Sequence, residues 1–141
     1  MSTTTRITYE QFDEMIRRGD FEDAEDRYEL LFGEICIMPQ PDPPHEWFVE
    51  ELNEWSFQAA PLDAVRVRVQ GSLGIPALES VPEPDLLWLR RDDYSARRPG
   101  PDDALLVIEV AESSLAKDRG PPRPARIETT TRPALFAAQF V

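Results

Sequence analysis

The spacing of apolar and polar residues changes from helical to strand-like along the first third of the chain. Thr8 followed by Gln11 forms a capping-box pattern at the start of a helical repeat, which predicts a helix over residues 9–18. Residues 27–39 are mainly apolar on both sides of Gly33-Glu34. This pattern predicts two antiparallel strands joined by a tight turn.

The middle of the chain contains four further segments with a clear period. Apolar residues recur at helical spacing over residues 45–58, which predicts a second helix. Residues 64–70 alternate strictly between apolar and polar, as in a half-buried strand. The runs 84–89 and 104–111 are apolar. They predict two more strands, the second of them a central strand buried on both faces.

The chain changes character after Gly120. Residues 121–141 include four prolines and show no clear period, so they are predicted to be largely irregular. A chain of 141 residues fits one core. We therefore predict one domain over residues 1–120, of α/β or α+β class, followed by a divergent proline-rich tail over residues 121–141.

The charge balance weighs against a simple nucleic-acid-binding surface. The chain has 15 basic and 27 acidic residues, giving a net charge of −12. Proteins that bind nucleic acids usually present a basic patch, because neutralising phosphates releases counterions. Most of the excess acid lies in runs within the first half, and runs of this kind are usually a solvated face.

Apolar stretches, the N-terminal sequence and the cysteine content indicate where in the cell the protein is expected. No apolar stretch reaches about 18 residues, so we expect no membrane span. The N-terminus lacks a signal-peptide pattern, which leaves a cytoplasmic location as the expectation. Cys36 is the single cysteine, which excludes an internal disulfide and a cluster of thiolate metal ligands.

The chemical signal is an acidic residue inside an apolar strand. Burying Glu109 unpaired in the run LLVIEVA would be costly, so a cation is expected near it. Asp85 begins the other apolar strand, and two carboxylates at neighbouring strand ends are suitable ligands for Mg²⁺ or Mn²⁺. The alternative is purely structural: a strand-end cap with an ion pair to Arg66 or Arg68.

These motifs, taken in order, resemble the Uma2 family of the PD-(D/E)XK nuclease superfamily. The resemblance rests on Glu83-Pro84-Asp85, on VIEVAESS at residues 107–114, and on the Asp-Arg-Gly triplet at residues 118–120. The segment RYELLFGEICIMP at residues 27–39 is similar to the first hairpin of that family. The resemblance covers roughly residues 8–120.

The resemblance implies a restriction-endonuclease-like fold, in which a mixed sheet is flanked by helices and is here incomplete at its C-terminal end. It implies hydrolysis of DNA phosphodiester bonds, with Mg²⁺ or Mn²⁺ held by Asp85 and Glu109. Glu34 matches a further acid of the family, and His45 matches a histidine that could carry a proton or contact substrate. A histidine at a helix start is otherwise most often a capping or surface residue.

Two more residues are carried over as substrate contacts. Gln70 matches the end of a family strand, although a plain exposed strand residue is the simpler interpretation. Arg119 could reach the site as a cation, but arginine transfers protons poorly.

The match fails at the superfamily lysine. The position two residues after Glu109 is Ala111, and the alternative position on the following helix is Pro122. Lys117 is the single lysine of the chain, and it lies where the family varies. A cation that stabilises the developing charge is therefore missing. The loss of the pattern after Gly120 suggests a truncated or frame-shifted ending.

Three functions remain open from the sequence. The first is a metal-dependent endonuclease. The second is a non-catalytic relic or protein-interaction module that keeps the nuclease fold. The third discards the family and leaves a small acidic α+β binding protein with capping carboxylates. A missing helix and strand would also expose apolar sheet surface, which makes a homo-oligomer a further expectation.

Overall fold

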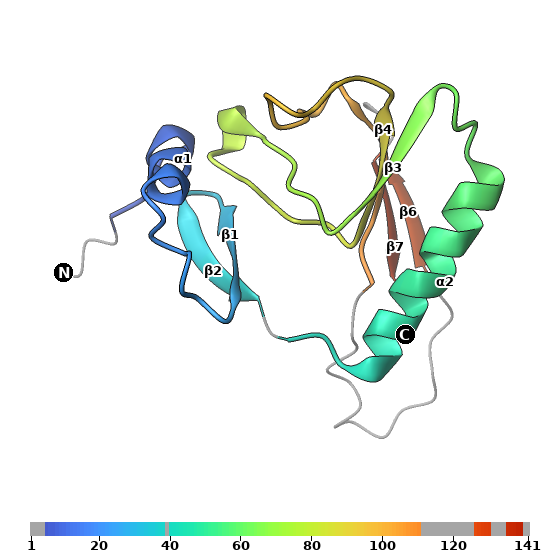
Figure 1. Ribbon diagram of the computed structural model, residues 1–141, viewed down its shortest axis with the longest axis horizontal. Coiled ribbons are helices and arrows are strands. Elements are labelled where there is room, and N and C mark those ends of the chain that lie inside the picture. Colours follow the sequence, from blue (N-terminus) through green and yellow to red (C-terminus); the bar gives the residue numbers. More distant parts are fainter. Residues whose placement is uncertain (1–4, 39, 111–125, 131–134, 140–141) are drawn as a thin grey trace.

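The computed structural model describes residues 5–38, 40–110, 126–130 and 135–139 (Figure 1). Two helices, one 3₁₀ turn and seven strands lie in these ranges. In chain order they are α1 (Tyr9–Arg17), β1 (Arg27–Leu31), β2 (Glu34–Met38), α2 (Pro43–Ala59), β3 (Val65–Val69), the 3₁₀ turn (Pro76–Leu78), β4 (Leu86–Arg90), β5 (Ala104–Ile108), β6 (Arg126–Thr130) and β7 (Leu135–Gln139).

The first helix begins as its capping box predicts. The Thr8 hydroxyl accepts the Gln11 N–H at 3.1 Å, and the Gln11 side chain accepts the Thr8 N–H at 2.9 Å. Phe12 packs with Leu30 and Val81, which fixes the helix against the hairpin formed by β1 and β2. The N-terminal third of the chain therefore folds as predicted.

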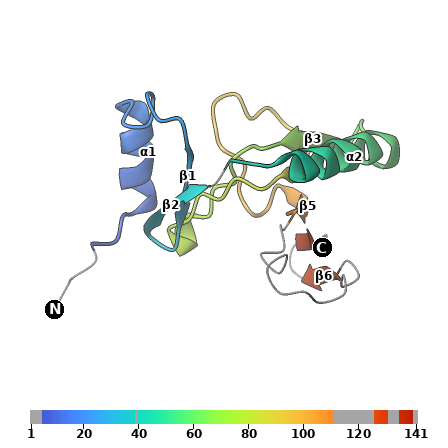
Figure 2. The same ribbon diagram turned by 90° about the horizontal axis from the view of Figure 1, so that it is seen from below.

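The hairpin connects its strands through a turn of two residues. Phe32 and Gly33 both have positive φ, 49° and 78°, as in the turns that match the twist of a hairpin. The pairing places Arg27 opposite Met38 at one end of the hairpin and Leu31 opposite Glu34 at the turn. Figure 2 shows α1 and the hairpin on one side of the molecule, with α2 and the second sheet on the other.

The second sheet has the order β3-β4-β5, and both pairings are antiparallel. Leu86, Leu87 and Leu89 of β4 are fully buried, so β4 provides much of the core. The sequence predicted that residues 104–111 would form the central strand. In this sheet the middle strand is β4, and β5 pairs with it along one edge.

The second helix packs along β3 and β4 (Figure 1). Trp55 stacks on Trp88 of β4 with ring centroids 5.4 Å apart, and the Trp88 indole N–H donates to the Ser56 hydroxyl at 2.9 Å. Asp42 caps the helix by accepting the His45 N–H at 3.1 Å. The contacts of Trp55 and Ser56 hold the C-terminal half of α2 against β4, and the Asp42 cap defines the start of the helix, where His45 lies.

The α+β class is confirmed. Every strand pair among the described residues is antiparallel, so the parallel pairing expected for a mixed sheet is not found there. Within residues 121–141, predicted to be irregular, β6 and β7 form an antiparallel pair, and β7 contacts β5. The tail is therefore not irregular throughout. No helix in the described part of the chain is long and apolar enough to cross a membrane.

Candidate functional site

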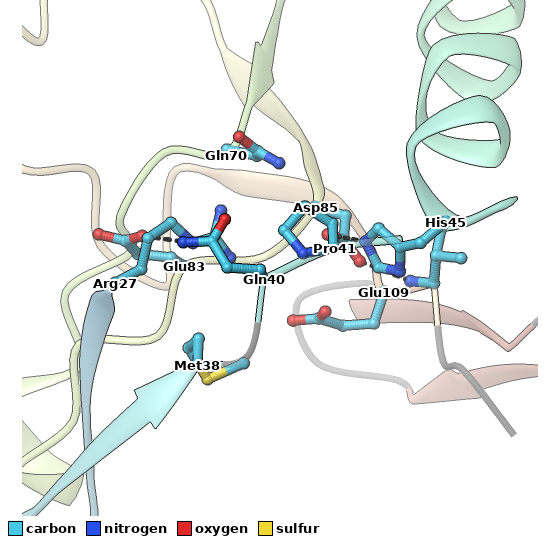
Figure 3. A pocket seen from close by; sticks show the side chains of 10 residues that line it. Arg27, Met38, Gln40, Pro41, His45, Gln70, Glu83, Asp85 and Glu109 are labelled. Carbon is cyan, nitrogen blue, oxygen red and sulfur yellow. Dashed lines mark hydrogen bonds and ion pairs between the residues drawn. The ribbon is translucent and has the colours of Figure 1, made fainter. Parts of the chain in front are cut away.

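A pocket of about 160 Å³ lies at the start of β4 and the end of β5, next to the start of α2 and the open end of the hairpin (Figure 3). Its walls come from segments far apart in the sequence. They are formed by Arg27, Met38, Gln40, Pro41, His45, Gln70, Glu83, Asp85, Glu109 and Val110.

Asp85 is fixed at the centre of this pocket. The residue is only 4% exposed, and it directly precedes β4. One carboxylate oxygen lies 3.0 Å from Nε2 of His45, and the other accepts the Val110 N–H at 2.7 Å. These two contacts tie the carboxylate to the start of α2 and to the residue after Glu109.

Glu109 enters the same pocket because of the strand register. Leu86 pairs with Ile108, so the residue before β4 and the residue after β5 lie at the same end of the sheet. Figure 3 shows the Glu109 side chain reaching toward the middle of the pocket, near Asp85. The predicted pairing of these two acids at neighbouring strand ends is therefore what the structure shows.

The two carboxylates repel each other. The pKa of Glu109 is raised to about 8, first because the carboxylate loses solvation and then because of the negative charges of Asp85 and Glu29. The residue Glu109 is exposed when all its atoms are taken together. Its pKa depends instead on how many protein atoms and charges surround the carboxylate group. The pocket therefore holds more negative charge than its own cations neutralise.

His45 belongs to the pocket rather than to the outer surface. Its side chain is only 14% exposed and contacts Asp85, as described above. Gln70 also lines the pocket, and its backbone N–H donates to the Asp85 carbonyl at 3.0 Å. Figure 3 shows the Gln70 side chain at the edge of the group, apart from Asp85 and Glu109.

One of the predicted site residues that the structure describes, Glu34, is not brought to the pocket. Glu34 is exposed at the turn of the hairpin, four residues along β2 from Met38. At about 3.3 Å per residue, roughly 13 Å separates Glu34 from the pocket end of that strand. Arg119 lies outside the described residues, as do Ala111, Lys117 and Pro122.

The acid that the hairpin does bring to the site is Glu29, which the sequence analysis missed. Glu29 is 4% exposed, and its carboxylate accepts the Glu83 N–H at 2.9 Å. Burial raises the pKa of Glu29. The signal was present in the sequence, because Glu29 interrupts the strand RYELL as Glu109 interrupts LLVIEVA. Glu29 holds the backbone that leads into Asp85.

Removing the Glu29 carboxylate is expected to weaken the fold measurably. Glu29→Ala leaves the Glu83 N–H without its acceptor, so we expect a loss of about 1–3 kcal/mol in the free energy of unfolding. Glu29→Gln keeps an acceptor oxygen and should retain most of the stability. Urea unfolding measures both, with the exposed Glu34→Ala as the control on the same hairpin. Equal effects of Glu29→Ala and Glu34→Ala would contradict the assignment.

The acidic side chains and the histidine of the pocket determine whether it could hold a metal ion. No group of three or more His, Cys, Asp or Glu side chains within the described ranges is arranged to hold a metal ion. Mg²⁺ usually keeps several waters, however, and is often held by only one or two carboxylates. The Asp85 and Glu109 carboxylates, whose negative charges oppose each other when both are ionised, fit that limited requirement.

Comparison with known proteins identifies a family for this sequence. The model of the Uma2 family, described as "Putative restriction endonuclease", matches residues 9–125. No curated protein matches the sequence. The family match includes every residue that lines the pocket, and it continues five residues beyond Gly120, where the resemblance in the motifs ended. Since the match spans well over half of the 141 residues, the chain belongs to the Uma2 family.

Proposed function

We propose that the protein is a metal-dependent endonuclease that hydrolyses phosphodiester bonds in DNA. Membership of a family described as restriction endonucleases supports nuclease chemistry. The observation that carries the proposal is the convergence of Asp85 and Glu109 in one pocket, where burial and then the charge of Asp85 raise the pKa of Glu109. A DNA substrate also agrees with the expected cytoplasmic location, which is part of the proposal.

Asp85 and Glu109 would hold the metal, which we propose to be Mg²⁺ or Mn²⁺. When bound, such a cation polarises a phosphoryl oxygen and lowers the pKa of a bound water. Without a cation, the pocket would repel a phosphate, because Glu83 adds a third acid to its wall. A divalent ion therefore provides both the missing charge and the chemistry.

The other pocket residues would position the reacting groups. The His45 contact, together with the Val110 N–H, restricts rotation of the Asp85 carboxylate, so that its orientation is set before substrate arrives. Arg27 lines the pocket and lies 3.9 Å from Glu83, where it offers positive charge to a phosphate. Gln70 can donate hydrogen bonds to the same group.

A second candidate is a non-catalytic relic or protein-interaction module that keeps the nuclease fold. The observation that favours it is the absence of a lysine at residues 111 and 122, since Lys117 is the single lysine of the chain. A site without that cation stabilises the developing negative charge less well. Catalysis would then be slow or lost while the pocket persists.

A cleavage assay distinguishes the two candidates. Purified protein is incubated with supercoiled and with linear DNA in the presence of Mn²⁺, and binding of Mn²⁺ is measured separately by calorimetry. Cleavage that Asp85→Asn abolishes supports the endonuclease. Mn²⁺ binding without cleavage supports the non-catalytic candidate, and the absence of both rejects the metal site.

A further inference from the structure

A second hollow, of about 440 Å³, lies between α1, β3 and the loop before β5. We call it the arginine hollow. Its lining is mostly polar and combines three guanidinium groups with two aromatic rings and hydroxyl groups. The residues that matter here are Tyr9, Arg68, Ser72, Tyr94, Arg97 and Arg98.

Two of these arginines are held in place by acids and hydroxyls. Arg98 contacts Asp13 and the Tyr9 hydroxyl, each at 2.8 Å, and Ser72 at 3.0 Å. Arg97 pairs with Asp92 and Asp103, also at 2.8 Å. These contacts use only part of each guanidinium, which carries five N–H donors. The acids therefore set the direction of the remaining donors as well as offsetting charge.

Arg68 differs from both, because it makes no ion pair with any residue that the structure describes. Its guanidinium carbon lies 5.9 Å from the centre of the Tyr94 ring, and Arg97 stacks on the same ring at 4.8 Å. Two positively charged guanidinium groups are thus placed beside one aromatic ring. A bound anion would reduce the repulsion between them. The paired N–H donors of the Arg68 guanidinium therefore remain available to a ligand.

The hollow lies next to the candidate pocket. Arg68 precedes Gln70 by two residues, and Gln70 lines the pocket. A further depression has Ser72 and Arg98 in common with the hollow, and Glu83 in common with the pocket. A strand of nucleic acid could therefore reach both places at once.

We infer that the arginine hollow binds a backbone phosphate of the DNA strand whose scissile bond lies in the pocket, with Arg68 as the main contact. Planar guanidinium groups bind phosphate through paired hydrogen bonds, and hydroxyls such as that of Ser72 add to them. The inference rests on the proposed function. It places one guanidinium that has no ion pair among the described residues, that of Arg68, beside the site of a chain whose net charge is −12.

The test compares two arginines of β3 that differ in their surroundings. Arg68→Gln removes the proposed contact, while Arg66→Gln removes the same charge from an exposed position outside the hollow. Fluorescence anisotropy follows binding of a short labelled DNA duplex in Ca²⁺ over a range of salt concentrations. We expect Arg68→Gln to weaken binding about tenfold and to lower the salt slope by about 1, with little change for Arg66→Gln.

A second variant and a competitor show whether the loss of binding comes from the lost phosphate contact. Arg68→Lys retains the positive charge without the paired N–H donors, so it should keep the salt slope but bind DNA less tightly than the parent. If Arg68→Gln does not fold, Arg68→Lys takes its place in the comparison. Poly-L-glutamate should not compete; Arg68-dependent competition would make the hollow a carboxylate site and overturn the inference. Equal binding by Arg68→Gln and Arg66→Gln, or no DNA binding by the parent, would also overturn it.

The outcomes separate the two proposals. If the parent cleaves DNA and both glutamine variants bind it equally, the arginine hollow fails while the endonuclease stands. If Arg68→Gln alone loses DNA binding and no protein cleaves, the hollow stands and the catalytic proposal fails.

Discussion

Asp85→Asn is expected to lower the rate of Mn²⁺-dependent DNA cleavage by about 100-fold or more, because a bound metal supplies several kcal/mol of transition-state stabilisation. The variant removes one of the two carboxylates that would hold the ion. It should leave the fold intact, since the asparagine oxygen can still accept the Val110 N–H. Its amide can then donate to an unprotonated Nε2 of His45, which occupies the position next to the other oxygen.

Cleavage rate, Mn²⁺ affinity and circular dichroism together measure this effect. Asp102→Asn is the matched control, because Asp102 is an exposed aspartate on the loop before β5. We expect the control to cleave and to bind Mn²⁺ as the parent does. If Asp85→Asn keeps the parent's affinity for Mn²⁺ while remaining folded, the metal site has been assigned to the wrong residues.

The elements up to β5 and the central pair of acids could be predicted because their signals are local. An alternating or continuous apolar run shows where a strand lies, and an acid at its end is visible without any tertiary information. Asp85 and Glu109 meet because β4 and β5 are neighbours that run antiparallel. Once those two strands pair, residues before one and after the other must lie at one end of the sheet.

The choice between Glu29 and Glu34 could not be made in this way. Both acids lie in the same hairpin. The family resemblance pointed to Glu34 beside the turn, although Glu29 is the acid that interrupts an apolar strand. Which end of the hairpin faces the pocket depends on the bridge between Leu30 and Val81, a contact between segments about fifty residues apart. Local spacing contains no information about that contact.

The arginine hollow was hidden for a related reason. Arg66 and Arg68 alternate with valines and both read as outward-facing residues of a half-buried strand. Only the packing of Tyr94 and the following loop against β3 distinguishes them, by placing an aromatic ring beside Arg68. The overall charge of −12 concealed this local concentration of guanidinium groups, because net charge says nothing about where charges lie.

The stability of the metal-free protein is expected to fall as pH rises, and Glu109→Gln should remove much of that fall. Folding raises the pKa of Glu109 from its ordinary 4.5 to about 8, so the folded state holds the proton more tightly than the unfolded state does. The stabilisation is complete below about pH 4.5 and is lost as pH rises to about 8. Glu29 changes stability in the same direction in both proteins, because its pKa is also raised.

Urea unfolding between pH 5 and pH 9 (roughly the window of that titration) tests this expectation, with Glu34→Gln as a control for the loss of one exposed charge. The parent and Glu34→Gln should lose stability in parallel, while Glu109→Gln should give a flatter profile. Parallel profiles for all three would mean that burial and the charge of Asp85 do not raise the pKa of Glu109.

Adding Mn²⁺ at the alkaline end of this range should reverse the loss in the parent. A ligand that binds only the folded state at 100 times its dissociation constant stabilises it by about 2.7 kcal/mol. The parent should gain that amount, because the cation neutralises the repulsion between Asp85 and Glu109. Glu109→Gln, already relieved of the repulsion and short of one ligand, should gain much less. An equal gain in both proteins would place the ion elsewhere, and the two carboxylates would then meet for structural reasons alone.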